Sequence, residues 1–166
     1  TSGTAGAYTI DRFNYSPTQA SKGTWGQNLN SAAPPAGFTN YLGFQTSGSA
    51  YSVLSTDAFT FGQPIEGFNI ADLAWGTASA KTVTLSFQVY SSLTGTFGGA
   101  VGNSSNNRSY PFAYTISSAN TWTSVSVTIP GDKTIYRTET QLVILKPNTS
   151  PVVEGGYAMK VQSKRV

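Results

Sequence analysis

The stretch KTVTLSFQVY, residues 81–90, decides the fold class. Val83, Leu85, Phe87 and Val89 alternate in it with threonine, serine, glutamine and tyrosine. A period of two residues is the pattern of a β-strand with one buried side and one side that meets water. Threonine suits the outer side because β-branched residues lie well on a pleated surface. The stretch therefore predicts a half-buried strand.

The same alternation recurs in short segments along the chain. Clusters of glycine, proline, asparagine and serine separate these segments, and such residues favour turns. Many short strands with turns between them are typical of a β-sandwich or jelly roll. We therefore predict an all-β fold of this kind. Further strands are expected over residues 8–15, 41–46, 51–55, 58–65, 110–117 and 122–130.

Two segments depart from the strand pattern. Residues 69–75 place apolar side chains at i, i+3 and i+4, which predicts one helical turn, with Asn69 as its N-terminal cap and Gly76 at its end. Residues 91–107 are rich in glycine, serine and asparagine. We expect a long connecting loop there, which is either functional or mobile.

The composition excludes several kinds of site. Cysteine and histidine are both absent, which removes thiol nucleophiles, disulfides, histidine-based triads and most zinc sites. We therefore expect no catalytic residue, no metal and no cofactor. Charged residues make up only 10% of the chain and aromatic residues 13%, which is not the composition of a disordered chain. No apolar run approaches the roughly 20 residues of a membrane-spanning helix, so no membrane partner is expected.

The positive charge gathers towards the C-terminal end. Residues 1–132 carry a net charge of −1 and residues 133–166 a net charge of +4. Such asymmetry marks either a contact with nucleic acid or an acidic partner, or a solvated basic end. Because no aromatic platform is interleaved with these basic residues, nucleic acid is not an expected partner.

We divide the chain into a sandwich module, residues 1–132, and a C-terminal segment, residues 133–166. In the second part, the apolar run 142–145 predicts a strand covered on both faces, and the last residues predict a terminal strand or basic arm. This segment either completes the sandwich or contacts a neighbouring subunit. The candidates for an assembly contact are Tyr157, Met159, Lys160, Val161, Lys164 and Arg165.

Glycan binding is one function that the residues suggest, because sugars dock on exposed aromatic faces surrounded by amides and hydroxyls. Trp25 lies in the polar stretch KGTWGQN and is expected to be exposed. Trp75 and Trp122 are favoured as core residues because aromatic side chains bury the largest apolar areas. The glycan-binding candidates are Trp25, Tyr41, Asn106, Asn107, Arg108 and Tyr110.

Several motifs follow one another along the chain: YTIDRFNYS (8–16), FGQPIEGFNIADLAWGTASAKTVTLSF (61–87), SSLTGTF (91–97), RSYPFAYTI (108–116) and VTIPGD (127–132). In this order they resemble a module of bacteriophage tail fibres, especially those of marine and cyanobacterial podoviruses. Phe13 stands where a DRW-type motif of that module has tryptophan. The resemblance covers about residues 6–132, and residues 133–166 depart from it.

The resemblance implies a jelly-roll sandwich similar to carbohydrate-binding modules, within a virion structural protein. Our first expectation is a tail fibre, or a capsid decoration or appendage, that assembles with itself into a homotrimer or another symmetric oligomer and contacts other virion proteins. The alternative is a glycan-binding adhesin domain for host recognition.

A third possibility is a polysaccharide-degrading spike, which requires two suitably spaced carboxylates. Glu66 and Asp72 form the nearest such pair, and Asp72 is better placed to stabilise the start of the helical turn. We therefore do not expect an enzyme.

Overall fold

The computed structural model describes residues 13–29, 32–46, 52–105, 107–134, 141–146 and 156–164, the last two ranges through the pairing of their strands. These residues form β-strands and one short 3₁₀ helix, η1. The all-β prediction is confirmed. The elements are β1 (Asn14–Pro17), β2 (Gly23–Gln27), β3 (Leu42–Thr46), β4 (Phe59–Ile65), η1 (Gly67–Leu73), β5 (Val83–Ser91), β6 (Gly95–Asn103), β7 (Ser109–Ile116), β8 (Thr123–Ile129), β9 (Gln141–Lys146) and β10 (Gly156–Lys164).

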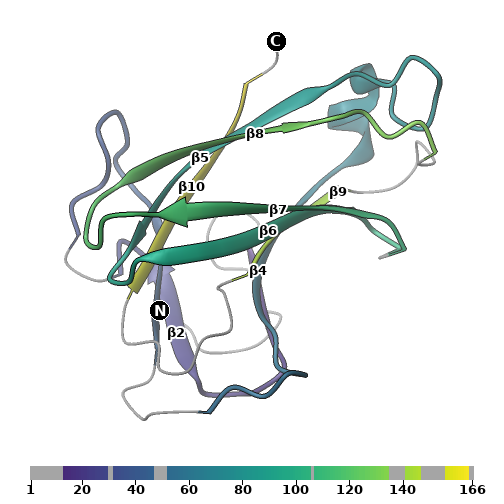
Figure 1. Ribbon diagram of the computed structural model, residues 1–166. Helices are drawn as coiled ribbons and strands as arrows, with labels where there is room; N and C mark the ends of the chain where they lie inside the picture. The colour runs from purple at the N-terminus through teal and green to yellow at the C-terminus, as the bar shows by residue number, and fades with distance from the viewer. Residues whose placement is uncertain are drawn as a thin grey trace.

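The strands form two five-stranded sheets. The first has the order β1-β4-β9-β6-β7 and the second the order β2-β3-β10-β5-β8, with antiparallel pairing throughout. Figure 1 shows β5, β8 and β10 together in one layer and β6, β7 and β9 in the other. This is the jelly-roll β-sandwich that the sequence predicted.

Strand β5 has the alternation from which the prediction began. Leu85, Phe87 and Val89 are buried, whereas Ser86 and Gln88 remain partly exposed. The buried side chains face the first sheet, since the ring of Phe87 lies 5.2 Å, centre to centre, from that of Tyr114 on β7. The polar side chains therefore face outwards from the second sheet.

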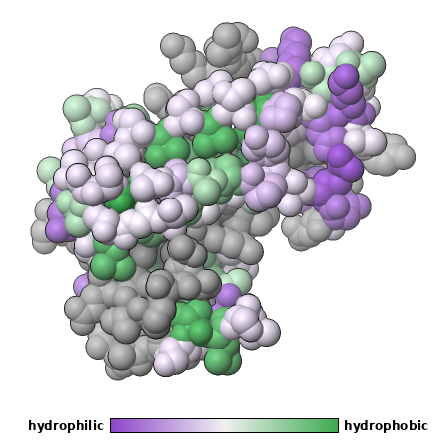
Figure 2. All heavy atoms as spheres, viewed as in Figure 1, coloured by the Kyte–Doolittle hydropathy of each residue, from purple (hydrophilic) through white to green (hydrophobic). Residues whose placement is uncertain are grey.

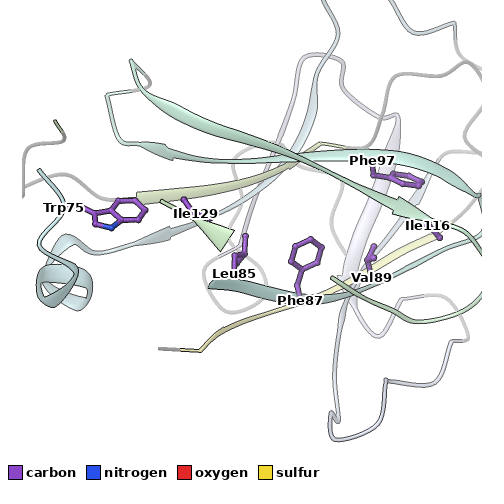
Figure 3. Packing of buried hydrophobic residues seen from close by; sticks show 7 residues of the cluster. All are labelled: Trp75, Leu85, Phe87, Val89, Phe97, Ile116 and Ile129. Atoms are coloured by element: carbon purple, nitrogen blue, oxygen red, sulfur yellow. The ribbon is translucent and has the colours of Figure 1, made fainter. Parts of the chain in front are cut away.

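Two clusters of buried side chains fill the sandwich. The first draws residues from both sheets, and Figure 3 shows its side chains between the layers, with Trp75 at the end near η1. Trp75 is 8% exposed, which confirms it as a core residue. The first cluster comprises Trp75, Leu85, Phe87, Val89, Phe97, Ile116 and Ile129. The second comprises Phe13, Tyr15, Trp25, Leu42, Phe44 and Phe61.

The C-terminal segment supplies the middle strand of each sheet. Strand β9 lies between β4 and β6, and β10 lies between β3 and β5, so both predicted strands form. Both strands of this segment therefore lie within the sandwich, and a contact with a neighbouring subunit stays a prediction. An assembly role for residues 157–164 stays a prediction, and Arg165 lies outside the described residues.

Two predictions of local structure were wrong. Residues 95–103, expected in a loop, form β6, which pairs with β7 on one side and β9 on the other. Backbone hydrogen bonds to two neighbours override the weak strand propensity of its glycines. Residues 52–55 form no strand, because the Leu54 backbone N–H donates to the Asp57 carboxylate at 2.8 Å and the Asp57 N–H donates back to the Leu54 carbonyl at 3.0 Å. These two bonds close a turn.

The predicted helical turn exists, but its ends differ. It begins at Gly67, and the Asn69 side chain does not cap it but donates to the Glu66 carboxylate at 2.8 Å. It ends at Leu73, and its C-cap is Ala74, whose φ of 53° is left-handed, two residues before Gly76. Among the described residues, no helix has the length and apolar character needed to cross a membrane.

Candidate functional site

Two of the predicted glycan-binding aromatics are buried. Trp25 is 1% exposed and Tyr41 is 3% exposed, so neither ring offers a face to a sugar, and the expectation that Trp25 is exposed was wrong. Trp25 lies on β2 opposite Phe44 of β3, inside the second core cluster. The adjacent Thr24 is exposed on the opposite side of the strand because successive side chains alternate.

Tyr41 instead supports another aromatic residue. Its hydroxyl donates to the Leu29 carbonyl at 3.0 Å and its backbone N–H donates to the Asn28 side-chain oxygen at 2.9 Å. Burial, and secondly the neighbouring Tyr90, raise the pKa of the Tyr41 hydroxyl. The ring meets that of Trp122 edge-on, with 5.6 Å between ring centres.

Trp122 is only partly buried, so its prediction as a core residue was wrong. Its ring lies between those of Tyr41 and Tyr90, at 5.6 and 5.5 Å. The indole N–H donates to the Ala33 carbonyl at 2.9 Å, and the Tyr90 hydroxyl donates to the Asn120 side chain at 3.3 Å. These contacts fix the indole in one orientation while part of it still meets solvent.

A hollow of about 240 Å³ lies on the outward side of β5 and β8; we call it the sheet-face hollow. Ser124 and Gln88, which line it, lie two residues along their strands from Trp122 and Tyr90, on the same side of the sheet. The described residues that line it are all uncharged. They are Phe38, Ser86, Phe87, Gln88, Ser124, Val125 and Ser126.

An amide cluster lies beside Tyr41. The Gln27 and Asn28 side-chain amides both donate to the Asn40 side-chain oxygen. All three residues are exposed. These bonds join the end of β2 to Asn40, the residue before Tyr41.

A second hollow, of about 320 Å³, lies at one end of the sandwich; we call it the Arg108 hollow. The predicted residues Arg108 and Tyr110 line it, together with Trp75, Asp132 and Lys133. Figure 2 shows hydrophilic residues gathered at the end of the molecule where, in Figure 1, the loop between β6 and β7 and the end of β8 lie. Arg108 and Tyr110 thus both contribute to this hollow, and their role in glycan binding stays a prediction.

Arg108 is held by one ion pair. Its Nε–H donates to Oδ2 of Asp132 at 2.7 Å. The other oxygen, Oδ1, accepts bonds from the Thr134 backbone N–H and hydroxyl, both at 2.8 Å. The hydrogen bond from Arg108 lowers the pKa of Asp132, and Asp132 raises the pKa of Arg108. The carboxylate is therefore charged at neutral pH and fixed at both oxygens.

The loop before Arg108 is shaped by a buried amide. Asn103 is 3% exposed, and its side-chain oxygen accepts the backbone N–H groups of Asn107 and Arg108, both at 3.2 Å. The Asn103 amide donates to the Asn107 side-chain oxygen at 2.6 Å. Asn107, a predicted sugar ligand, is therefore already hydrogen-bonded within the loop. Asn106, another predicted ligand, lies outside the described residues.

The carboxylates considered for catalysis lie at η1. The Glu66 carboxylate accepts the Asn69 amide, and Asp72 is exposed. Within the described ranges, no group of three or more aspartate, glutamate, cysteine or histidine residues could hold a metal ion.

The sequence matches no family model and no curated protein. Solved structures with a similar fold include the enzymatically active domain of tailspike protein 4 from bacteriophage CBA120, at 13% identity and a TM-score of 0.58 over 98% of this chain. The chain spans only 21% of that tailspike chain. A family 11 carbohydrate-binding module from Clostridium thermocellum, in complex with a β-1,3-1,4-mixed-linked tetrasaccharide, has 11% identity and a TM-score of 0.52 over 96% of this chain and 92% of its own.

The carbohydrate-binding module TmCBM61, in complex with β-1,4-galactotriose, has 7% identity and a TM-score of 0.52, also over 96% of this chain and 92% of its own. At such low identities these similarities show the fold alone. That fold is a β-sandwich shared by carbohydrate-binding modules and part of a phage tailspike.

Proposed function

We propose that this chain is a glycan-binding module and that the sheet-face hollow is its binding site for an uncharged saccharide. The observation that carries the proposal is Trp122, a partly exposed indole in contact with two tyrosine rings. It lies two residues before Ser124, which lines a hollow with hydroxyls and an amide. The similar fold of saccharide-bound modules supports it.

The chemistry of the hollow suits a neutral sugar. Serine hydroxyls and the glutamine amide both donate and accept hydrogen bonds, as sugar hydroxyls do. Ser86 and Ser126 lie with their Oγ atoms 3.5 Å apart, and Gln88 is next to them on β5. Binding sites of this type combine apolar and aromatic surface with a few well-placed polar groups. Since none of the described residues that line the hollow is charged, an uncharged glycan fits it best.

We further propose that the module belongs to a phage appendage, as a tail-fibre component that presents this site to a host surface. The ordered sequence motifs resemble those of tail fibres, and the fold is shared with part of a phage tailspike. A location in the virion and assembly into a symmetric oligomer with other virion proteins belong to this proposal. It assigns no catalytic step to the chain.

A glycan array with the purified chain tests the binding function, followed by titration of each bound saccharide. Trp122→Ala is expected to weaken binding at least tenfold, which corresponds to about 1.4 kcal/mol. Phe68→Ala is the matched control, since Phe68 is an aromatic residue that is 92% exposed and outside both hollows.

Because Trp122 also contacts Tyr41 and Ala33, Gln88→Ala serves as a second variant with less effect on folding. It is expected to weaken binding several-fold with an unchanged melting temperature. The proposal fails if no saccharide binds, or if the control loses as much affinity as Trp122→Ala.

A further inference from the structure

The Arg108 hollow differs from the sheet-face hollow in its charge. Among the described residues that line it, Arg108 and Lys133 outnumber Asp132, which gives these residues a net charge of +1. We propose that this hollow is a second subsite, in which Arg108 binds the carboxylate of an acidic saccharide such as a uronic acid. This inference rests on the proposed glycan-binding function.

The Arg108 guanidinium has N–H donors beyond the one that binds Asp132. It carries five N–H donors, and the bond to Asp132 uses the one on Nε. Within the part of the chain that the structure describes, no partner is assigned to the two Nη groups, and the Arg108 side chain is 46% exposed. A guanidinium binds a carboxylate through two parallel N–H···O bonds, and the two Nη groups form one such pair of donors.

The ion pair with Asp132 orients the two Nη groups of Arg108, which we call its donor fork. Both oxygens of Asp132 are engaged, one with Arg108 and the other with Thr134, so the carboxylate fixes the guanidinium from one side. Gly131 fixes the turn itself, since a Cβ atom there would lie 2.6 Å from the backbone carbonyl carbon of Ala80. An exposed ion pair of this kind contributes little to stability. Its clearer effect is to present the outer edge of Arg108 in a defined direction.

The remaining lining suits a sugar ring better than a simple anion. Tyr110 is 37% exposed and offers part of its ring within the hollow. Ser109 adds a hydroxyl beside it, and Lys133 a second positive charge. The indole N–H of Trp75 is already bonded to the Lys81 carbonyl at 2.8 Å, so Trp75 contributes apolar surface alone. A carboxylate attached to a pyranose would meet charge, aromatic surface and a hydroxyl together.

NMR titration of the full chain with sodium glucuronate tests the inference, with glucose and sodium acetate as comparison ligands at matched ionic strength. Glucuronate is expected to shift the Arg108 side-chain resonances and the amides of residues 109, 110 and 131–133. Glucose should leave them unchanged, and acetate should bind at least several-fold more weakly than glucuronate. Equal binding of acetate would show a carboxylate site without saccharide recognition and overturn the proposal.

Three variants separate geometry from charge. Arg108→Gln is expected to lower glucuronate affinity at least tenfold, and Arg108→Lys, which keeps the charge but loses the fork, several-fold. Lys81→Gln removes the same charge outside the hollow and should have no effect. A melting temperature within a few degrees of the parent protein shows that each variant folds.

The outcomes distinguish this inference from the proposed function. If neutral glycans bind in a Trp122-dependent manner while glucuronate shifts nothing at Arg108, the function stands and the second subsite is wrong. The same conclusion follows if Arg108→Gln binds glucuronate as well as the parent protein, and the ion pair then serves only to fix the loop before β7. If neither saccharide binds, both proposals fail.

Discussion

Replacing Tyr15 with phenylalanine is expected to stabilise the sandwich. The Tyr15 side chain is 2% exposed and its ring stacks on that of Phe61, 4.7 Å away between centres. Within the described residues, its hydroxyl has no hydrogen-bond partner. A buried polar group without a partner costs about 1–3 kcal/mol. Phenylalanine keeps the ring contacts and removes the hydroxyl, so we expect the free energy of unfolding to rise by about 1 kcal/mol at pH 8.

The same substitution should flatten the loss of stability in alkali. Burial raises the pKa of Tyr15 to about 12, whereas an unfolded tyrosine ionises near 10. Because the folded pKa is the higher one, the contribution of this group is fully present below pH 10 and is lost between pH 10 and 12. Each pH unit in that window removes about 1.4 kcal/mol, so the parent protein should lose roughly 1.4 kcal/mol more than Tyr15→Phe by pH 11.

Urea unfolding at pH 8 and pH 11, followed by tryptophan fluorescence, measures both effects. The difference between parent and variant cancels the contribution of Tyr41, whose pKa is also raised. Tyr110→Phe is the control, since Tyr110 is 37% exposed, and it should change stability at pH 8 by less than about 0.5 kcal/mol. The reasoning is refuted if Tyr15→Phe destabilises the protein at pH 8, or if its stability falls with pH as steeply as that of the parent.

Two further predictions concern the sheets. Gly43→Ala should destabilise the protein by about 2–3 kcal/mol in urea unfolding, because the new Cβ would lie 2.6 Å from the Leu29 carbonyl oxygen. Gly98→Ala is the control: its nearest contact would be at 3.7 Å, so it should leave the stability unchanged or raise it slightly. Equal effects of the two substitutions would contradict the packing around Gly43. Deleting residues 154–166 removes β10 and leaves β3 and β5 with unpaired edges. The cooperative unfolding transition should therefore disappear and the chain should aggregate. A truncated chain that is folded and soluble would show that the sandwich does not need β10.

The sequence predicted those strands whose buried side carries a run of apolar residues. In β5, Leu85, Phe87 and Val89 made the period visible. Strand β2 lacks such a signal because glycine occupies a buried position beside Trp25. A Cβ at Gly23 would lie 2.3 Å from the ring of Phe44, so close packing excludes the apolar side chain that would have shown the alternation. The stretch around Trp25 therefore has a polar sequence, which led to the prediction that Trp25 is exposed.

The candidate sites were predictable only in part, because residues that meet in one site lie far apart in the sequence. Arg108 and Tyr110 were singled out from their own motif, but Asp132, which orients Arg108, is 24 residues away. The outward side chains of β5 were visible as a polar series. Their meeting with Ser124 depends on the register between β5 and β8, which aligns Gln88 with Ser124 and which no local pattern encodes.

Strand β10, near the end of the chain, lies beside the strand that carries part of the proposed binding face. Strand β5, which carries half of the sheet-face hollow, pairs with β8 on one edge and with β10 on the other, where Lys160 lies opposite Gln88. A basic C-terminal segment that first suggested a separate assembly arm is thus a neighbour of the proposed sugar site. The outward surface of β5 keeps its shape only while both edges are paired, because unpaired strands lose the hydrogen bonds that hold them in the sheet. An assembly contact that withdrew β10 from this sheet would therefore also remove the proposed binding face, so an assembly contact that is compatible with the proposed glycan binding must leave β10 paired with β5.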